Sequence, residues 1–126
     1  MTSTVDTLGA APYVLVTSYR KDGRAVPTPV WVVRDGDAIA IWTVHDSGKV
    51  KRIRRDGTVL VGPCDLRGRL TGQEVPGQAI ILTPIESARI KELLKQKYGL
   101  TGRITLWGSK IRRGEDGTLG IRITLS

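Results

Sequence analysis

The chain has 126 residues, 40% of them hydrophobic, and a formal net charge of +8. This length fits a single domain, 1–126, and no apolar run approaches the roughly 20 residues of a membrane span. The only cysteine is Cys64 and the only histidine is His45, which excludes an intrachain disulfide and a histidine-rich metal site. No signal segment begins the chain, so we expect a soluble cytoplasmic protein. The positive charge predicts an anionic partner, which could be nucleic acid, a membrane surface or a small phosphorylated or polycarboxylate ligand.

The first half of the chain predicts three consecutive strands after a short N-terminal helix or arm that ends at Pro12. Asp22-Gly23 and Asp35-Gly36 are two-residue hairpin signals, because a type I′ turn needs positive φ at both central positions. β-Branched and aromatic residues predict strands on either side of these turns. The three strands span 13–19, 25–34 and 38–43.

The middle strand contains Pro27 and Pro29, whose missing N–H groups lie on the same side of the strand. One interpretation is an edge strand or a bulge, because that side cannot complete a hydrogen-bonded ladder. The other is functional: open backbone carbonyls and a flat apolar wall against which a planar ring could lie. The wall would consist of Thr28, Pro29, Val30 and Trp31.

A basic helix is predicted directly after the third strand. Asp46 or Ser47 is its N-cap candidate, and Val50 and Ile53 form its apolar stripe. The first turn offers unpaired backbone N–H groups, a positive dipole end, the Ser47 hydroxyl and the Lys49 ammonium, which are the ingredients of a phosphate site. The alternative is a solvated basic helix with an ordinary serine cap. Lys49 and Arg52 should border what the helix packs over, whereas Lys51 and Arg55 should face water.

The second half predicts strands at 58–65 and 70–82, the latter interrupted near Pro76-Gly77. Thr83 as N-cap, Pro84 in the first helical position and Glu86 in a capping box begin a helix that ends at Gly99. Two closing strands follow at 103–107 and 119–125. The face on which the helix packs is expected to contain Ile85, Ala88, Leu93 and Leu94.

Strands joined by hairpins, without βαβ alternation, predict a mainly β (α+β) fold: an antiparallel barrel with helices over its openings. No hydrolase triad, P-loop, Rossmann fingerprint or carboxylate pair is present. An enzyme with this sequence would therefore rely on a bound cofactor, and no protein side chain is assigned as catalytic.

The segment from Thr43 to Lys49 lines up without gaps with the Thr-Asn-x-x-Ser-x-Lys phosphate-binding segment of pyridoxamine 5′-phosphate oxidases. The wider run 13–71 resembles the flavin/deazaflavin oxidoreductase B group of that split-barrel superfamily. Phrases similar to those of actinobacterial proteins that bind coenzyme F420 are 20–24, 28–31, 42–43, 46–50 and 63–69. The sequence departs from the oxidase pattern at Val44, where that pattern has Asn, and it lacks the oxidase's basic residue on the second strand and its substrate-binding C-terminus. We therefore do not expect oxidation of pyridoxamine phosphate.

The resemblance implies a split antiparallel barrel of six to seven strands with two to three flanking helices, forming a homodimer with sites at the interface. It implies coenzyme F420 as cofactor, with FMN as the alternative, and a reductase that passes hydride to a planar electron-poor small molecule. His45 could donate a proton. Lys51, Arg54, Arg55, Arg67 and Arg69 would attract the anionic tail of F420. The cofactor-binding residues would be Thr28, Pro29, Val30, Trp31, Trp42, Thr43, Ser47, Gly48, Lys49 and Arg52.

Two other hypotheses remain open. The same fold could bind FMN or heme as an oxidase or carrier. Alternatively, Trp31, Trp42 and Trp107 with the basic residues could form a stacking groove for nucleic acid, although the primary expectation is a small-molecule substrate without nucleic acid or membrane.

Overall fold

The computed structural model describes residues 4–44, 48–99 and 118–125. These residues form three helices and seven strands. The helices are α1 (Thr4–Ala10), α2 (Gly48–Arg55) and α3 (Pro84–Gly99). The strands are β1 (Tyr13–Tyr19), β2 (Ala25–Val30), β3 (Val32–Asp35), β4 (Ala38–Val44), β5 (Thr58–Cys64), β6 (Val75–Ile81) and β7 (Thr118–Leu125).

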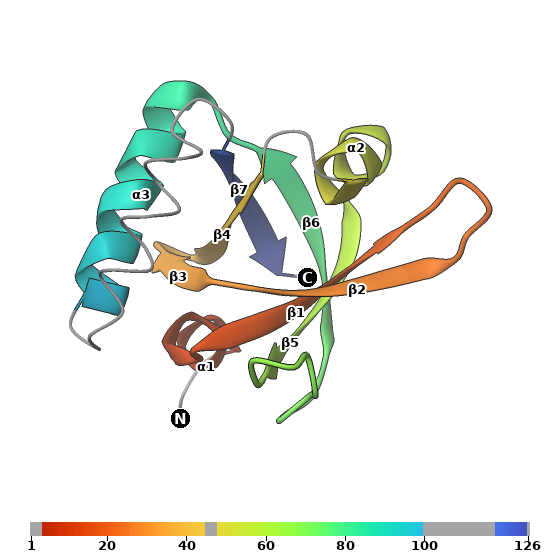
Figure 1. Cartoon of the computed structure of the whole chain (residues 1–126), viewed down its shortest axis with the longest axis horizontal. Coiled ribbons are helices and arrows are strands. Elements are labelled where there is room, and N and C mark those ends of the chain that lie inside the picture. The colour runs from red at the N-terminus through yellow and green to blue at the C-terminus, as the bar shows by residue number, and fades with distance from the viewer. Residues whose placement is uncertain (1–3, 45–47, 100–117, 126) are drawn as a thin grey trace.

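All seven strands belong to one antiparallel sheet in the order β2-β1-β5-β6-β7-β4-β3. The sheet curls into a half-barrel whose two edge strands, β2 and β3, follow each other in the chain (Figure 1). This confirms the predicted split-barrel fold. The prediction of a single strand at 25–34 is wrong, because strand pairing is interrupted at Trp31. β2 pairs with β1, whereas β3 pairs with β4.

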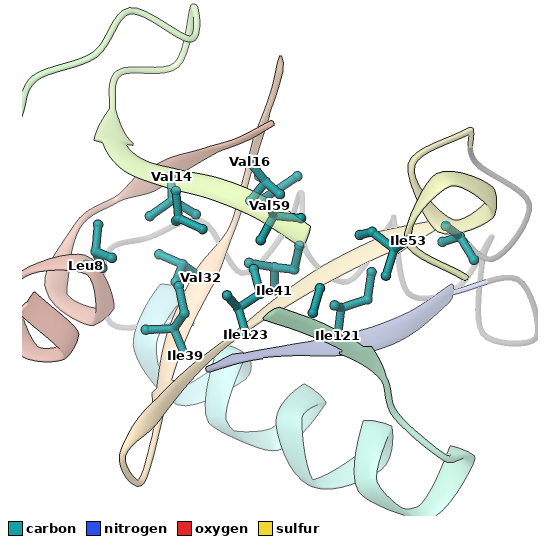
Figure 2. Close-up of a cluster of buried hydrophobic side chains, with 14 of the residues drawn as sticks. Leu8, Val14, Val16, Val32, Ile39, Ile41, Ile53, Val59, Ile121 and Ile123 are labelled. Atoms are coloured by element: carbon teal, nitrogen blue, oxygen red, sulfur yellow. The ribbon is translucent and has the colours of Figure 1, made fainter. Parts of the chain in front are cut away.

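The main hydrophobic core lies inside the curled sheet. Figure 2 shows Leu8 of α1 at one end of this cluster and Ile53 of α2 at the other, with strand residues between them. Val50 and Ile53 are both buried, which confirms the apolar stripe predicted for α2. Burying each such side chain stabilises the fold by about 1.5–3 kcal/mol, and this burial fixes α2 against the sheet.

Helix α3 packs on the outer face of β3, β4 and β7 through a second cluster that includes Ile90, Leu94 and Tyr98. The predicted packing face is wrong in its first turn, because Ala88 is exposed and Ile85 is 86% exposed. The buried stripe runs instead through Ser87, whose hydroxyl accepts a hydrogen bond from the Gly120 N–H of β7 at 3.0 Å.

The capping box at the start of α3 is confirmed. The Thr83 hydroxyl accepts a hydrogen bond from the Glu86 N–H at 3.2 Å, and a Glu86 carboxylate oxygen accepts one from the Thr83 N–H at 3.1 Å. These reciprocal bonds satisfy donors that the first helical turn leaves unpaired. The bond from the Thr83 N–H, and then one that the Thr83 hydroxyl donates to the same carboxylate oxygen at 3.0 Å, hold the pKa of Glu86 below its ordinary value.

The two hairpin turns differ from the predicted type I′ geometry. Among the described residues only glycines have positive φ, with Gly23 at 90° and Gly36 at 61°. The first turn is a longer loop, closed by bonds from the Gly23 N–H to the Arg20 carbonyl and from the Arg20 N–H to the Arg24 carbonyl, both 2.9 Å. The second turn is the pair Gly36-Asp37, since β3 ends at Asp35 and β4 begins at Ala38.

Strand β6 is shorter than the expected strand 70–82, and it runs without interruption through Pro76 and Gly77. Leu70 makes only an isolated bridge with Cys64. Pro76 pairs with Leu60 of β5 but has no partner on β7, because the ladder with β7 begins only at Gly77. A residue without an N–H is tolerated where one side of the strand is unpaired. The strand expected at 103–107 lies outside the described residues.

None of the helices in the described part of the chain is long and apolar enough to cross a membrane.

The C-terminal end of α3 ties the start of β1 to the edge strand β3. The Tyr98 hydroxyl accepts a hydrogen bond from the Val32 N–H at 3.0 Å and donates one to the Pro12 carbonyl at 2.8 Å. The Lys97 ammonium donates to the carbonyls of Gly9, Ala11 and Val32 at 2.7–2.9 Å. These bonds fix the N-terminal segment against the barrel.

Tyr98→Phe should lower the free energy of unfolding by about 1–3 kcal/mol, because it leaves the buried Val32 N–H without its acceptor. Chemical denaturation measures the change. Tyr19→Phe, at a half-buried position on β1, is the control and should change stability by no more than about 0.5 kcal/mol. Equal effects of the two variants would contradict the anchoring role of the Tyr98 hydroxyl.

Candidate anion-binding site

The core of the candidate site is the contact between Lys49 and Thr43. The Lys49 ammonium donates a hydrogen bond of 2.7 Å to the Thr43 hydroxyl, and Lys49 is only 6% exposed. Thr43 belongs to β4 and faces the same side as the core residues Ile39 and Ile41, because side chains alternate along a strand. Lys49 occupies the first turn of α2, so the end of β4 and the start of α2 together hold one buried cation.

The electrostatics of Lys49 favour an anion at this place. Burial, and then repulsion from Arg52, lower the pKa of Lys49 to about 8. Among the described residues, no carboxylate forms an ion pair with Lys49 or Arg52. A buried cation with a neighbouring cation and no carboxylate partner is an energetically costly arrangement. A bound phosphate would supply the missing negative charge.

Arg52 lies beside Lys49 and is held from the opposite strand. Its Nε donates a hydrogen bond of 2.7 Å to the Ser18 hydroxyl of β1. Its guanidinium folds back over the first helical turn, since a Cβ atom placed on Gly48 would lie 2.8 Å from the Arg52 Nη1. Burial and repulsion from Arg20 lower the pKa of Arg52. The guanidinium therefore lies near the helix start, where the helix dipole already favours anions.

A cationic cleft is lined by residues of α2, Arg52 among them, and of the β1–β2 hairpin. Figure 1 shows α2 and this hairpin on the same side of the molecule. Its volume is about 480 Å³. The Arg55 guanidinium closes one side of it by donating to the Tyr19 carbonyl at 2.6 Å. Among the described residues of its lining the one acidic side chain is Asp22, which forms an ion pair with Arg24 at 2.9 Å. The cationic cleft is lined by Arg20, Lys21, Asp22, Arg24, Lys51, Arg52 and Arg55.

The predicted phosphate-binding residues are partly brought together. Thr43, Gly48, Lys49 and Arg52 meet at the start of α2, as the contacts above establish, and Lys51 and Arg55 are exposed as expected. Ser47 and His45 lie outside the described residues. Arg69 does not line the cleft but pairs with Asp65 at 2.9 Å, and Arg67 lies in the same loop.

The predicted ring-binding wall is distributed over both faces of the sheet. Thr28 is half-buried opposite Val16, and Val30 is buried in the main core, whereas Pro29 is exposed. Trp31 stacks on Tyr98, with ring centroids 5.0 Å apart and an interplanar angle of 24°. Trp42 also packs against the outer cluster, on the face opposite to Thr43. Of these side chains, Thr28 shares its face with Ser18, the partner of Arg52.

The edge-strand interpretation of the two prolines is confirmed, since β2 is the first strand of the sheet order. Pro27 pairs with Thr17 and Pro29 with Leu15. A proline has no N–H to give to β1, so both rings face the free edge of the sheet. The backbone of this edge is the part of the predicted wall that remains available.

Ser18, Arg20 and Arg24 were not among the predicted site residues. In the sequence, Ser18 is one polar residue within a predicted strand, and the hairpin residues have the pattern of an exposed turn. Their role depends on the hairpin lying beside α2, which is a contact between segments more than 20 residues apart in sequence. The local signals were the density of basic residues on both segments and, for Arg20 and Arg24, the resemblance of the phrase 20–24 to F420-binding proteins.

Lys49→Met should stabilise the protein at pH 7 by about 1–3 kcal/mol, because it removes a buried ammonium that has no carboxylate partner within the described part of the chain. The pKa of Lys49 is lower in the folded chain than in the unfolded chain. The unfavourable contribution is therefore present below pH 8 and disappears as pH rises from about 8 towards 10.5.

Denaturant unfolding of both proteins at pH 7 and pH 10 measures this effect. The stability difference should shrink at the higher pH. Lys51→Met, which removes an exposed cation of the same helix, should show neither the stabilisation nor its loss. A Lys49→Met difference that is independent of pH would contradict the depressed pKa.

Comparison with known proteins gives evidence at the level of fold. No protein-family model and no curated protein sequence matches the chain. Solved structures do match. A conserved hypothetical protein from Mycobacterium tuberculosis superposes with a TM-score of 0.71 at 22% identity, over 96% of this chain and 77% of that one.

Two further structures have described activities. One described as an F420 reductase has a TM-score of 0.65 at 16% identity, over 100% of this chain and 96% of that one. A Listeria innocua protein provisionally described as a pyridoxamine 5′-phosphate oxidase has a TM-score of 0.61 at 18% identity, over 94% and 87%. These similarities show that the chain shares its split-barrel fold with these proteins.

Proposed function

We propose that this protein is an oxidoreductase that binds a phosphate-bearing flavin or deazaflavin cofactor, with coenzyme F420 as the cofactor. The observation that carries the proposal is the buried Lys49 ammonium, which contacts Thr43 and lies beside the Arg52 guanidinium without a carboxylate partner among the described residues. Two adjoining cations at a helix start suit a phosphate group, which accepts several charge-assisted hydrogen bonds at once.

The residues present fit such a group. Lys49 and Arg52 would bind the phosphate, and Thr43 would orient Lys49 through its hydroxyl. Ser47, predicted to complete the phosphate site, keeps that role in the proposal. Thr28 and the open edge of β2 would lie along the ring system, as predicted from the two prolines.

The charge of the cleft favours F420 over FMN. F420 carries a phosphodiester and a glutamate tail and is several-fold anionic, whereas FMN carries one monophosphate. The described lining of the cationic cleft has six basic residues, including Arg52, and one acidic residue. Exposed contacts of this kind contribute about 0.5–1 kcal/mol each and weaken with salt. The fold similarity to a protein described as an F420 reductase supports the same assignment.

Bound reduced F420 supplies a hydride from its C5 carbon to a planar, electron-poor acceptor. The protein would position both molecules and exclude water, which does not require an acid or base from the chain. His45 remains the predicted candidate for a proton donor.

We also propose that two copies of the chain associate, with the sites at their interface. Several large apolar side chains are exposed, and a second copy could cover them. They are Leu66 (70% exposed), Leu70 (44%), Ile80 (57%) and Ile85 (86%).

The cofactor proposal is tested by titrating the protein with F420 and with FMN. Binding should quench the fluorescence of F420. The dissociation constant should be lower for F420 than for FMN. The reduced form of F420 should be oxidised in the presence of a quinone, nitro or enone acceptor. Lys49→Ala and Arg52→Ala should each weaken F420 binding by about tenfold or more, because each removes a charged hydrogen bond.

The matched control is Lys95→Ala, which removes an exposed lysine of α3 and should leave the affinity unchanged. Tighter binding of FMN, or a Soret band on purification, would assign the alternative flavin or heme function. Binding of single-stranded DNA at physiological salt, unaffected by F420, would favour the nucleic-acid hypothesis instead.

The oligomer proposal predicts a mass of twice 13.8 kDa by native mass spectrometry and by light scattering at micromolar concentration. Leu66→Glu combined with Leu70→Glu should shift the population towards the monomer, since burying two unpaired carboxylates in an interface is unfavourable. A monomer of unchanged mass across the concentration range would contradict this proposal while leaving the cofactor proposal intact.

A further inference from the structure

We propose that Ser18 and Gly48 act together as positioning residues that direct the Arg52 guanidinium end-on towards the anion. This inference rests on the proposed function, because the anion is the cofactor phosphate. Ser18 lies on β1 and Gly48 lies at the start of α2, and both residues are uncharged.

Ser18 determines which edge of the guanidinium is available. The side chain is completely buried, with 0% exposure, and its hydroxyl accepts the Arg52 Nε hydrogen bond at 2.7 Å. A guanidinium can bind an oxyanion through Nε and one terminal nitrogen, or end-on through both terminal nitrogens. Because Ser18 occupies Nε, the end-on pair is left for a ligand.

Gly48 determines where that end-on pair lies. A Cβ atom at this position would lie 2.8 Å from the Arg52 Nη1 and 3.7 Å from its Cζ. A glycine therefore permits the guanidinium to rest against the first turn of α2, beside the helix N-terminus and Lys49. The backbone itself does not require glycine, since Gly48 is not among the residues with positive φ.

The positioning has an electrostatic consequence. Lys49 and Arg20 both repel Arg52, which disfavours holding its guanidinium in one place beside them. The Ser18 bond opposes this repulsion from a strand whose Val14 and Val16 are buried in the main core. The two cations therefore remain side by side before the anion arrives, which reduces the ordering that binding would otherwise require.

Gly48→Ala gives the sharpest test, because its effects on stability and on binding should have opposite signs. Alanine favours a helix over glycine, and among the described residues its Cβ would closely approach just the movable end of the Arg52 side chain. The variant should unfold at an equal or higher denaturant concentration than the parent. Its affinity for F420 and for inorganic phosphate should nevertheless fall about 3- to 10-fold, because Arg52 must move.

Ser18→Ala should weaken the same affinities by about 3- to 10-fold, because the guanidinium loses its fixed partner. In an Arg52→Ala background, neither substitution should have a further effect on affinity. Thr17→Ala is the matched control. It removes a buried hydroxyl from the residue that precedes Ser18 on β1 and faces the opposite side of the sheet, and it should leave the affinity unchanged.

The Arg52 Nε–H signal in ¹⁵N-edited NMR provides a readout that does not depend on the cofactor. In the parent protein its hydrogen should exchange slowly, and in Ser18→Ala it should exchange rapidly. Full affinity in both Ser18→Ala and Gly48→Ala, with Arg52→Ala still impaired, would overturn the inference and leave the proposed function standing. Absence of F420 and phosphate binding in the parent protein would overturn both.

Discussion

The buried ammonium of Lys49 is the interaction on which the proposed site depends. Its only hydrogen bond among the described residues is to the Thr43 hydroxyl, and a neutral hydroxyl compensates only part of the cost of burying a charge. The position is nevertheless maintained because Val50 and Ile53, on the same short helix, insert into the barrel core. Hydrophobic burial thus holds a cation where electrostatics alone would not. A binding site of this kind is less stable without its anion than with it, so ligand binding should couple directly to folding stability.

The arrangement of charges around α2 also separates two roles of basic residues. Lys49 and Arg52 are held in place by hydrogen bonds to buried hydroxyl groups, and both have lowered pKa values because burial disfavours the charged form. The other cations of the cleft are more exposed and are screened by salt. Lys49 and Arg52 can select an oxyanion by the geometry of their hydrogen bonds. The surrounding basic residues contribute mainly long-range attraction. A several-fold anionic ligand would use both contributions, and a monophosphate would use chiefly the first.

Local patterns predicted the elements well where a single physical rule decides the outcome. The capping box of Thr83 and Glu86 and the apolar stripe of Val50 and Ile53 are of this kind. The errors arise where tertiary contacts decide. The break at Trp31 follows from the closure of the barrel, and the packing face of α3 follows from the bond between Ser87 and Gly120. For the site, the sequence identified the cations of α2. It could not identify Ser18, because the role of that hydroxyl depends on how β1 lies against α2.

Strand β1 connects the site to the rest of the fold, since it is held at both ends by side chains from distant segments. At its start, the Tyr98 hydroxyl of α3 accepts the Val32 N–H and donates to the Pro12 carbonyl. Near its end, the Ser18 hydroxyl accepts a hydrogen bond from Arg52 of α2. Between these points β1 pairs with both β2 and β5, so it is rigid over its length. The hairpin that lines the cationic cleft continues directly from this strand. The outer helix α3 therefore supports the strand that positions Arg52 and supplies one wall of the cleft, although α3 itself lines no part of the site.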